Sequence, residues 1–116
     1  FVELNFTFNY FNSLPIPRLE RTHSLWSEVI KFSGRLAFED LRFKDWANKI
    51  DIECGSLESS EKNEYICKLD AVVAKIYGLN ENQVIHIYET FHQGWDFEPN
   101  LKKVLNFFDA YKQTNE

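Results

Sequence analysis

The stretch LDAVVAKIYGLNENQVIHIYETF, residues 69–91, carries the stop signal of one helix and the start signal of the next. Gly78 follows an apolar stripe with helical spacing, at the place where a helix-ending residue with a left-handed backbone belongs. Asn80 is a good N-cap residue, and Gln83 stands three residues after it, as in a capping box. The spacing therefore predicts a helical hairpin or a helix-turn-helix over residues 60–92.

The residues around this turn favour packing over the reading of DNA. Leu79 can pack on Val84 as a hydrophobic staple, which fixes the direction in which the second helix leaves the turn. A recognition helix offers Lys, Arg, Asn or Gln to base edges, whereas residues 81–91 contain two glutamates and no Lys or Arg. We therefore interpret the pair of helices as a packing unit.

Three further helical segments are expected on either side of this pair. Thr22 or Ser24 can cap the first of these segments, and Pro99 suits the first turn of the last. Within the pair itself, Ser59 or Ser60 can cap the helix that ends at Gly78. A break is expected near position 40, followed by a short amphipathic segment. The apolar stripes are Leu25, Trp26, Val29, Phe32 and Leu36; then Leu41, Phe43, Trp46 and Ile50; then Tyr65, Leu69, Val72, Val73, Ile76 and Tyr77; and finally Leu101, Val104, Leu105, Phe108 and Tyr111.

The N-terminal stretch has a different period. Residues 2–12 alternate apolar and polar side chains, which is typical of a half-buried strand, and Pro15 and Pro17 then stop any ladder of backbone hydrogen bonds. We expect residues 1–17 to be an extended segment and residues 18–116 a helical domain. The predicted fold is mainly α, a small bundle of four to five helices. The N-terminal segment or strand either lies along this bundle or pairs outside it.

Composition bounds the class of protein. At 116 residues with 16% aromatic side chains, the chain is one domain that can bury a real core. No apolar run approaches the roughly 18 residues of a membrane span, so no membrane partner is expected. Cys54 and Cys67 lie outside any metal-ligand or redox spacing, which favours reduced thiols and a cytoplasmic location. The net charge of −5 argues against a free-standing nucleic-acid binder.

No catalytic constellation is visible. His86 and His92 are six residues apart, whereas two ligands on one helix face are three or four apart, and His23 is distant from both. The serines lack a nucleophile motif, and the four glycines form no phosphate-binding loop. We therefore predict no catalytic, metal or cofactor-binding residue in this chain.

Four motifs, in this order along the chain, resemble one known family. They are NYFNSLPIPR, the helix end SGRLAF, the loop IECG, and LDAVVAKIYGLNENQVIHIYETFHQGWDF. Their sequence and order are similar to the C-terminal region of bacterial restriction-modification proteins that contain an N6-adenine DNA methyltransferase, often fused to an endonuclease. The resemblance covers nearly the whole chain, and its most specific pieces are residues 69–79 and 89–91.

The resemblance implies a non-catalytic helical module that follows a target-recognition region. Because the chain opens on Phe1 without a Met, we expect it to come from a longer protein, with residues 1–17 ending the upstream recognition domain. The parent would be a site-specific DNA adenine methyltransferase, a restriction endonuclease, or both, and would use S-adenosylmethionine. This chain lacks the family's catalytic and cofactor motifs. Its expected partners are the upstream domains of the same protein and, through them, double-stranded DNA.

A local basic set suggests how such a module would touch DNA. Residues 18–49 contain seven basic and five acidic side chains, which leaves a local charge of +2. Basic side chains on phosphates position a duplex without reading its sequence. The candidate phosphate contacts are Arg18, Arg21, Arg35, Arg42, Lys44 and Lys49. With five acids interleaved, an ordinary solvated helix surface is the alternative interpretation of these residues.

A second function class is a protein-interaction module. In this interpretation the chain docks a partner subunit through exposed aromatic surface near Trp26, Trp46 and Trp95. Binding to phosphates weakens steeply with salt, whereas docking through aromatic side chains does not, so salt dependence separates the two hypotheses.

Overall fold

The computed structural model describes residues 15–92, 94 and 96–114, and within them the chain is mainly helical, without strands. Its elements are α2 (Trp26–Ala37), the 3-10 helix η1 (Leu41–Phe43), α3 (Lys44–Lys49), α4 (Ser59–Ile76), α5 (Glu81–Phe91) and α6 (Glu98–Thr114). These five α-helices confirm the predicted bundle of four to five. The strand predicted over residues 2–12 lies outside the described residues, as does most of the segment predicted over 1–17.

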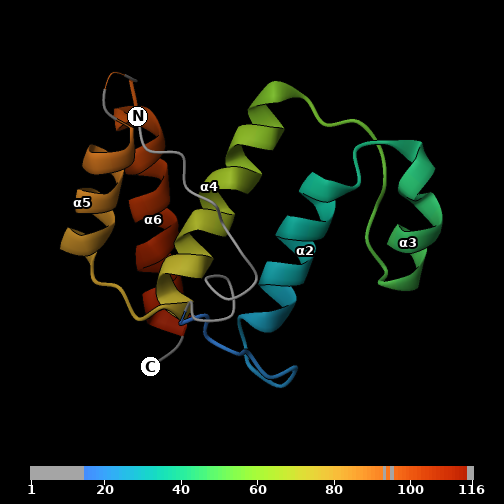
Figure 1. The fold of residues 1–116 in the computed structure, drawn as a ribbon, viewed down its shortest axis with the longest axis horizontal. Coiled ribbons are helices and arrows are strands. Elements are labelled where there is room, and N and C mark those ends of the chain that lie inside the picture. Colours follow the sequence, from blue (N-terminus) through green and yellow to red (C-terminus); the bar gives the residue numbers. More distant parts are fainter. Residues whose placement is uncertain (1–14, 93, 95, 115–116) are drawn as a thin grey trace, which may run out of the picture.

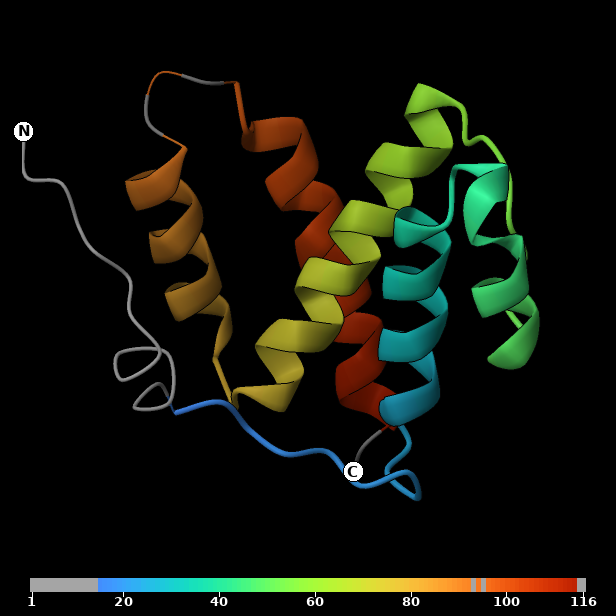
Figure 2. The same ribbon diagram turned by 45° about the vertical axis from the view of Figure 1, so that its right-hand side comes forward.

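Helix α4 is the centre of the fold. It packs on α2 on one side and on α6 on another, and α5 packs against α6. Both views place α4 between α5 and α2, with α6 running behind α4 in Figure 2, while α3 lies at the far side of α2 (Figure 1). No helix among the described residues is long and apolar enough to cross a membrane.

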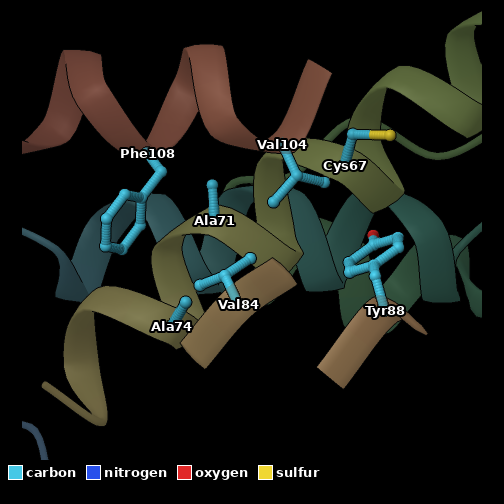
Figure 3. Packing of buried hydrophobic residues seen from close by; sticks show 7 residues of the cluster. All are labelled: Cys67, Ala71, Ala74, Val84, Tyr88, Val104 and Phe108. Carbon is cyan, nitrogen blue, oxygen red and sulfur yellow. The ribbon is translucent and has the colours of Figure 1, made fainter. Parts of the chain in front are cut away.

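The core of the α4, α5 and α6 half is built on small side chains. Cys67 and Ala71 of α4 are fully buried, and Ala74 nearly so. They meet side chains of α5 and α6 that point toward them in Figure 3. This cluster consists of Cys67, Ala71, Ala74, Val84, Tyr88, Val104 and Phe108. A second cluster joins Leu25 and Phe32 to Val72 on the α2 side of α4.

Part of the stripe predicted for α4 is wrong. Val72 is fully buried as expected, but Val73 is 37% exposed and Tyr77 is 47% exposed. The side that contacts α5 and α6 is instead the row of Cys67, Ala71 and Ala74. Helices approach most closely where side chains are small, so a search for large apolar residues overlooks such an interface. The stripe predicted for α6 is confirmed, because Val104 and Phe108 are buried.

The turn between α4 and α5 confirms its predicted chemistry. Gly78 has a φ of 71°, a left-handed conformation that favours glycine. The Asn80 side chain accepts from the Gln83 N–H and the Gln83 side chain accepts from the Asn80 N–H, each at 2.9 Å. Leu79 packs against the core cluster that contains Val84, as the staple requires. Both hydrogen bonds of a capping box are therefore present at the start of α5.

The caps predicted for α2 and α4 are wrong. Helix α2 follows a turn whose residue Leu25 is already helical at the N-cap position, and the Leu25 N–H donates to His23 Nδ1 at 3.1 Å. The preceding turn thus extends directly into the helix, so neither Thr22 nor Ser24 serves as the cap. Helix α4 has Glu58 as its extended N-cap residue, and Ser59 is its first helical residue.

The break near position 40 is confirmed. Asp40 caps η1, with its Oδ1 accepting from the Arg42 N–H at 2.9 Å. We call residues 40–52, which contain η1 and α3, the arm. The arm touches α2 closely: a Cβ added at Gly34 would lie 3.2 Å from Ile52 Cγ1. Ala47 is fully buried, whereas the apolar stripe predicted for this segment stays at the surface. A six-residue helix docks through its smallest side chain and leaves the large ones outside.

Candidate interaction surfaces

Two of the six predicted DNA-contacting residues hold the chain's own loops. Arg35 Nη1 donates to the Gly55 carbonyl at 2.7 Å and Nη2 to the Ser56 carbonyl at 3.3 Å, which ties the end of α2 to the loop before α4. Arg42 Nη2 lies 2.9 Å from Asp40 Oδ2. The hydrogen bonds from Arg42 lower the pKa of the Asp40 carboxyl below its ordinary value. Both arginines therefore have structural partners within the chain.

The other four basic residues are exposed but spread out. Arg18 and Arg21 precede α2, and the Arg21 guanidinium lies 5.9 Å from the ring centre of Trp26. Lys44 and Lys49 are the first and last residues of α3, after the other end of α2. The length of α2, about 18 Å for its 12 residues, separates Arg18 and Arg21 from the end of α2 that leads to Lys44, and Lys49 lies on α3, which runs beside α2 (Figure 1). The six residues therefore belong to different parts of the fold rather than to one compact cluster.

The arm exposes the largest apolar side chains of its sequence. Leu41 is 69% exposed and Trp46 is 64% exposed, and Phe43 and Ile50 are exposed as well. We call these four residues the arm surface. The Lys49 ammonium lies 5.0 Å from the Trp46 ring centre, a distance typical of a cation–π contact. The arm surface thus combines aromatic area with a basic rim of Lys44 and Lys49.

The three tryptophans of the docking hypothesis have different environments. Trp46 is exposed, as that hypothesis requires, whereas Trp26 is half-buried and lines a hollow near the start of the described chain. Trp95 lies outside the described residues. Among the tryptophans that the structure describes, Trp46 is the exposed one, and it belongs to the arm surface.

A second apolar surface was missed by the sequence analysis. A groove of about 630 Å³ runs between α4 and α5. It is lined by Leu69, Asp70, Val73, Ala74, Tyr77, Leu79, Val84, Ile87, Tyr88, His92 and Val104. The residues that open it, Val73 and Tyr77, were expected in the core. A helix that carries apolar residues on more than two sides is the sequence signal that would have indicated it.

The polar groups in this groove form a fixed arrangement. The Tyr88 hydroxyl donates to Asp70 Oδ2 at 2.6 Å, joining α5 to α4. Burial and this hydrogen bond raise the pKa of Tyr88, so the phenol stays protonated and acts as a donor. The His92 ring stacks on Tyr88 with ring centres 4.6 Å apart. In the core cluster beside the groove, burial raises the pKa of the Cys67 thiol, which makes it a poor nucleophile.

The lining of the groove is suited to binding an apolar segment. Of Tyr88 and Cys67, only Tyr88 lines the groove, and its hydroxyl is held by Asp70. In the part of the chain that the structure describes, no group of three or more His, Cys, Asp or Glu side chains could hold a metal ion. The apolar lining and the carboxylate of Asp70 can instead hold an apolar segment and accept its hydrogen bonds.

Comparison of the chain with models of protein families, with curated proteins and with solved structures finds no match.

Proposed function

We propose that this chain is a non-catalytic helical module of a DNA restriction-modification enzyme of the N6-adenine methyltransferase type. It supports target recognition by packing the arm surface against the recognition region of the same protein. The sequence resemblance, carried chiefly by residues 9–18 and 69–97, supports the type of enzyme. The structural observation that supports the proposal is the arm surface, where Trp46 and Leu41 are more than 60% exposed.

The composition of the arm surface fits an interface. Exposed apolar side chains that lie close together, with polar residues around them, mark protein interaction sites. Tryptophan is one of the residues that contribute most to such interfaces. Helix α3 presents Trp46 from a regular element whose Ala47 is anchored in the fold, so the aromatic side chain starts from a fixed backbone.

Phosphate contact is the second part of the proposal. Arg18, Arg21, Lys44 and Lys49 are exposed and can reach DNA phosphates, whereas Arg35 is held by the carbonyls of the 55–56 loop. In the parent enzyme, S-adenosylmethionine and the target adenine belong to the upstream domains. The module then holds the duplex by its backbone while recognition takes place upstream.

The supporting role is tested in the full-length enzyme by the double substitution Leu41→Ser and Trp46→Ser. Methyl transfer from S-adenosylmethionine to duplex DNA should fall, while the isolated chain keeps its melting temperature because both residues are exposed. Leu57→Ser, at a half-buried position in the loop before α4, is the control for a general loss of stability. Unchanged methylation and unchanged melting of the full-length enzyme with the double substitution would contradict the proposal.

The phosphate contacts are tested by fluorescence anisotropy with random-sequence duplex at about 50 mM and about 200 mM salt. The double substitution Lys44→Gln and Lys49→Gln should reduce the slope of log affinity against log salt by about 2, since each contact contributes about 0.9. The matched control is Lys102→Gln with Lys103→Gln, which makes the same charge change on α6. An equal effect of both pairs would exclude a contact specific to the arm.

The arm surface also supports a second candidate, docking of a separate partner subunit. Its apolar character favours binding that persists at high salt. The same Leu41→Ser and Trp46→Ser protein distinguishes the two. If the native enzyme contains two kinds of subunit and the substitutions separate them, without loss of methyl transfer by the remaining subunit, the arm binds a partner rather than the recognition region.

A further inference from the structure

Helix α4 is apolar on three sides, and the described bundle covers only two of them. Cys67, Ala71 and Ala74 contact α5 and α6, and Val72 contacts α2. The third side contains Ile66, Val73 and Tyr77, which are seven and four residues apart and therefore share one face of the helix. All three side chains are exposed. Exposed apolar side chains that lie along one line of a helix mark a surface that another segment can cover. The third side therefore fits a segment that lies along α4.

Two hollows meet on this third side. One is the α4–α5 groove, whose far wall includes the exposed Ile87. The other, about 350 Å³, is lined by Ile16 and Pro17 from the start of the described chain. Val73 and Tyr77 line both hollows. Ile16 and Pro17 thus lie at the edge of the groove, and residues 15–25 run near the lower end of α4 in Figure 2.

We propose that the N-terminal segment of this chain, residues 1–14, docks its apolar side chains into the α4–α5 groove. The segment precedes Pro15 directly, and 14 extended residues span at most roughly 46 Å, more than the about 27 Å of the 18-residue α4. Its apolar side chains recur at every second position: Val2, Leu4, Phe6, Phe8 and Tyr10. One face of such a segment matches an apolar groove.

Attachment to the same chain favours this occupant over a free partner. A tethered segment acts at an effective concentration on the order of millimolar, so modest apolar contacts suffice to hold it. An extended segment also carries backbone N–H groups that need acceptors, and Asp70 places a carboxylate in the lining of the groove. This inference does not depend on the proposed function, because it concerns two parts of one chain.

The docking is tested by cysteine cross-linking in the full chain. Val73→Cys is combined in turn with single cysteines at positions 4 to 11, in a Cys54→Ser background, with the buried Cys67 retained. Oxidation at low protein concentration should produce intramolecular disulfides at even positions such as Phe8→Cys several-fold faster than at odd positions such as Asn9→Cys. If Val73→Cys disturbs folding, Ile87→Cys on the opposite wall replaces it.

Two results of this experiment would overturn the proposal. Disulfides without a period of two would show that no fixed face meets the groove, and disulfides between two molecules would assign the groove to a second copy. A second measurement is the binding of an apolar fluorescent dye. Phe6→Asn with Phe8→Asn should increase dye binding, whereas Asn5→Ser with Asn9→Ser should leave it unchanged. Equal dye binding by both double variants would also contradict the docking.

Discussion

The α4–α6 half and the arm use apolar residues in opposite ways. In the α4–α6 half the fully buried positions of α4 are Cys67 and Ala71, which are small, and larger side chains from the neighbouring helices fill the space around them. In the arm the fully buried position is Ala47, and the larger Leu41 and Trp46 remain outside. Small residues mark the contact in both regions, but the neighbours of the long helix also cover some of its larger side chains, such as Val72.

Helix length explains this difference. Helix α4 has 18 residues and passes α2, α5 and α6, so apolar side chains pointing in several directions find partners. Helix α3 has six residues and, among the described α-helices, lies beside α2 alone (Figure 1), and its buried residue is Ala47. Burial of a large apolar side chain is worth about 1.5–3 kcal/mol, which the core gains and the arm surface leaves available for another surface.

The largest expected effect separates two adjacent residues of α4. Val72→Asp places a charge in a fully buried site between α2 and α4 without a partner, and should cost several kcal/mol, enough to unfold the chain. Val73→Asp puts the same charge on the groove side of α4, where the side chain can turn toward water once the docked N-terminal segment moves aside, and should cost only about 1 kcal/mol. Thermal unfolding followed by circular dichroism measures both.

Equal destabilisation by the two variants would contradict the assignment of α4 faces. In particular, unfolding by Val73→Asp would restore the stripe predicted from sequence, with Val73 in the core. Val72→Ala gives a graded version of the first change, since it removes volume without adding charge, and should lower stability by about 1–3 kcal/mol.

A smaller effect is expected at the contact between the arm and α2. Gly34→Val adds a branched side chain where even a Cβ would lie 3.2 Å from Ile52, so the arm must move away from α2. Overpacking of this kind costs about 1–3 kcal/mol. Ala37→Val on the same helix is the control, because Ala37 is exposed and loses only helix propensity.

Hydrogen exchange shows where the Gly34→Val effect is located. Amides of α3 should exchange faster in the variant, whereas amides of α4 and α6 should keep their protection. The reason is that the arm lies against α2, on the side away from α4 (Figure 1). Loss of protection throughout the bundle would show that the arm and the core unfold together, and that the contrast between the two regions does not extend to their stability.

Local signals in the sequence predicted the elements well. Gly78, Asn80 and Gln83 fix the turn between α4 and α5 through contacts among neighbouring residues, so their roles follow from sequence alone. The caps of α2 and α4 were not predicted: a turn whose His23 carbonyl accepts from the Trp26 N–H leads into α2, and Glu58 is the extended N-cap residue of α4 without a side-chain cap hydrogen bond. Capping by the preceding turn depends on its backbone conformation, which the residue types do not specify.

Contacts between distant segments limited what could be predicted of the candidate surfaces. Arg35 looked free to bind phosphate, yet its partners are carbonyls about 20 residues away. Val73 fits the helical spacing of a core residue as well as Val72 does, and the side of α4 that stays open depends on where α5 and α6 lie. Periodicity identifies apolar sides of a helix, but only the arrangement of its neighbours determines which side is covered.

The smallest effect concerns the hydrogen bond that joins α5 to α4. Tyr88→Phe removes the donor to Asp70 and should cost about 1 kcal/mol at neutral pH, while Tyr77→Phe at an exposed position should cost less. The pKa of Tyr88 is raised in the folded chain from its ordinary value of 10.0. Above about pH 10 the unfolded chain therefore binds fewer protons than the folded chain, so stability falls as the pH rises.

Urea unfolding between pH 8 and pH 11 measures this dependence. The Tyr88→Phe protein should lose less stability above about pH 10 than the native chain does, because one group with a raised pKa is gone. Some dependence should remain, since burial and the Glu28 charge raise the pKa of Tyr111 to about 12. Burial of the Cys67 thiol adds an earlier onset from about pH 9. Identical alkaline slopes in the two proteins would show that Tyr88 ionises as easily in the folded chain as in water, and the groove beside α5 would then be wetter than its lining indicates.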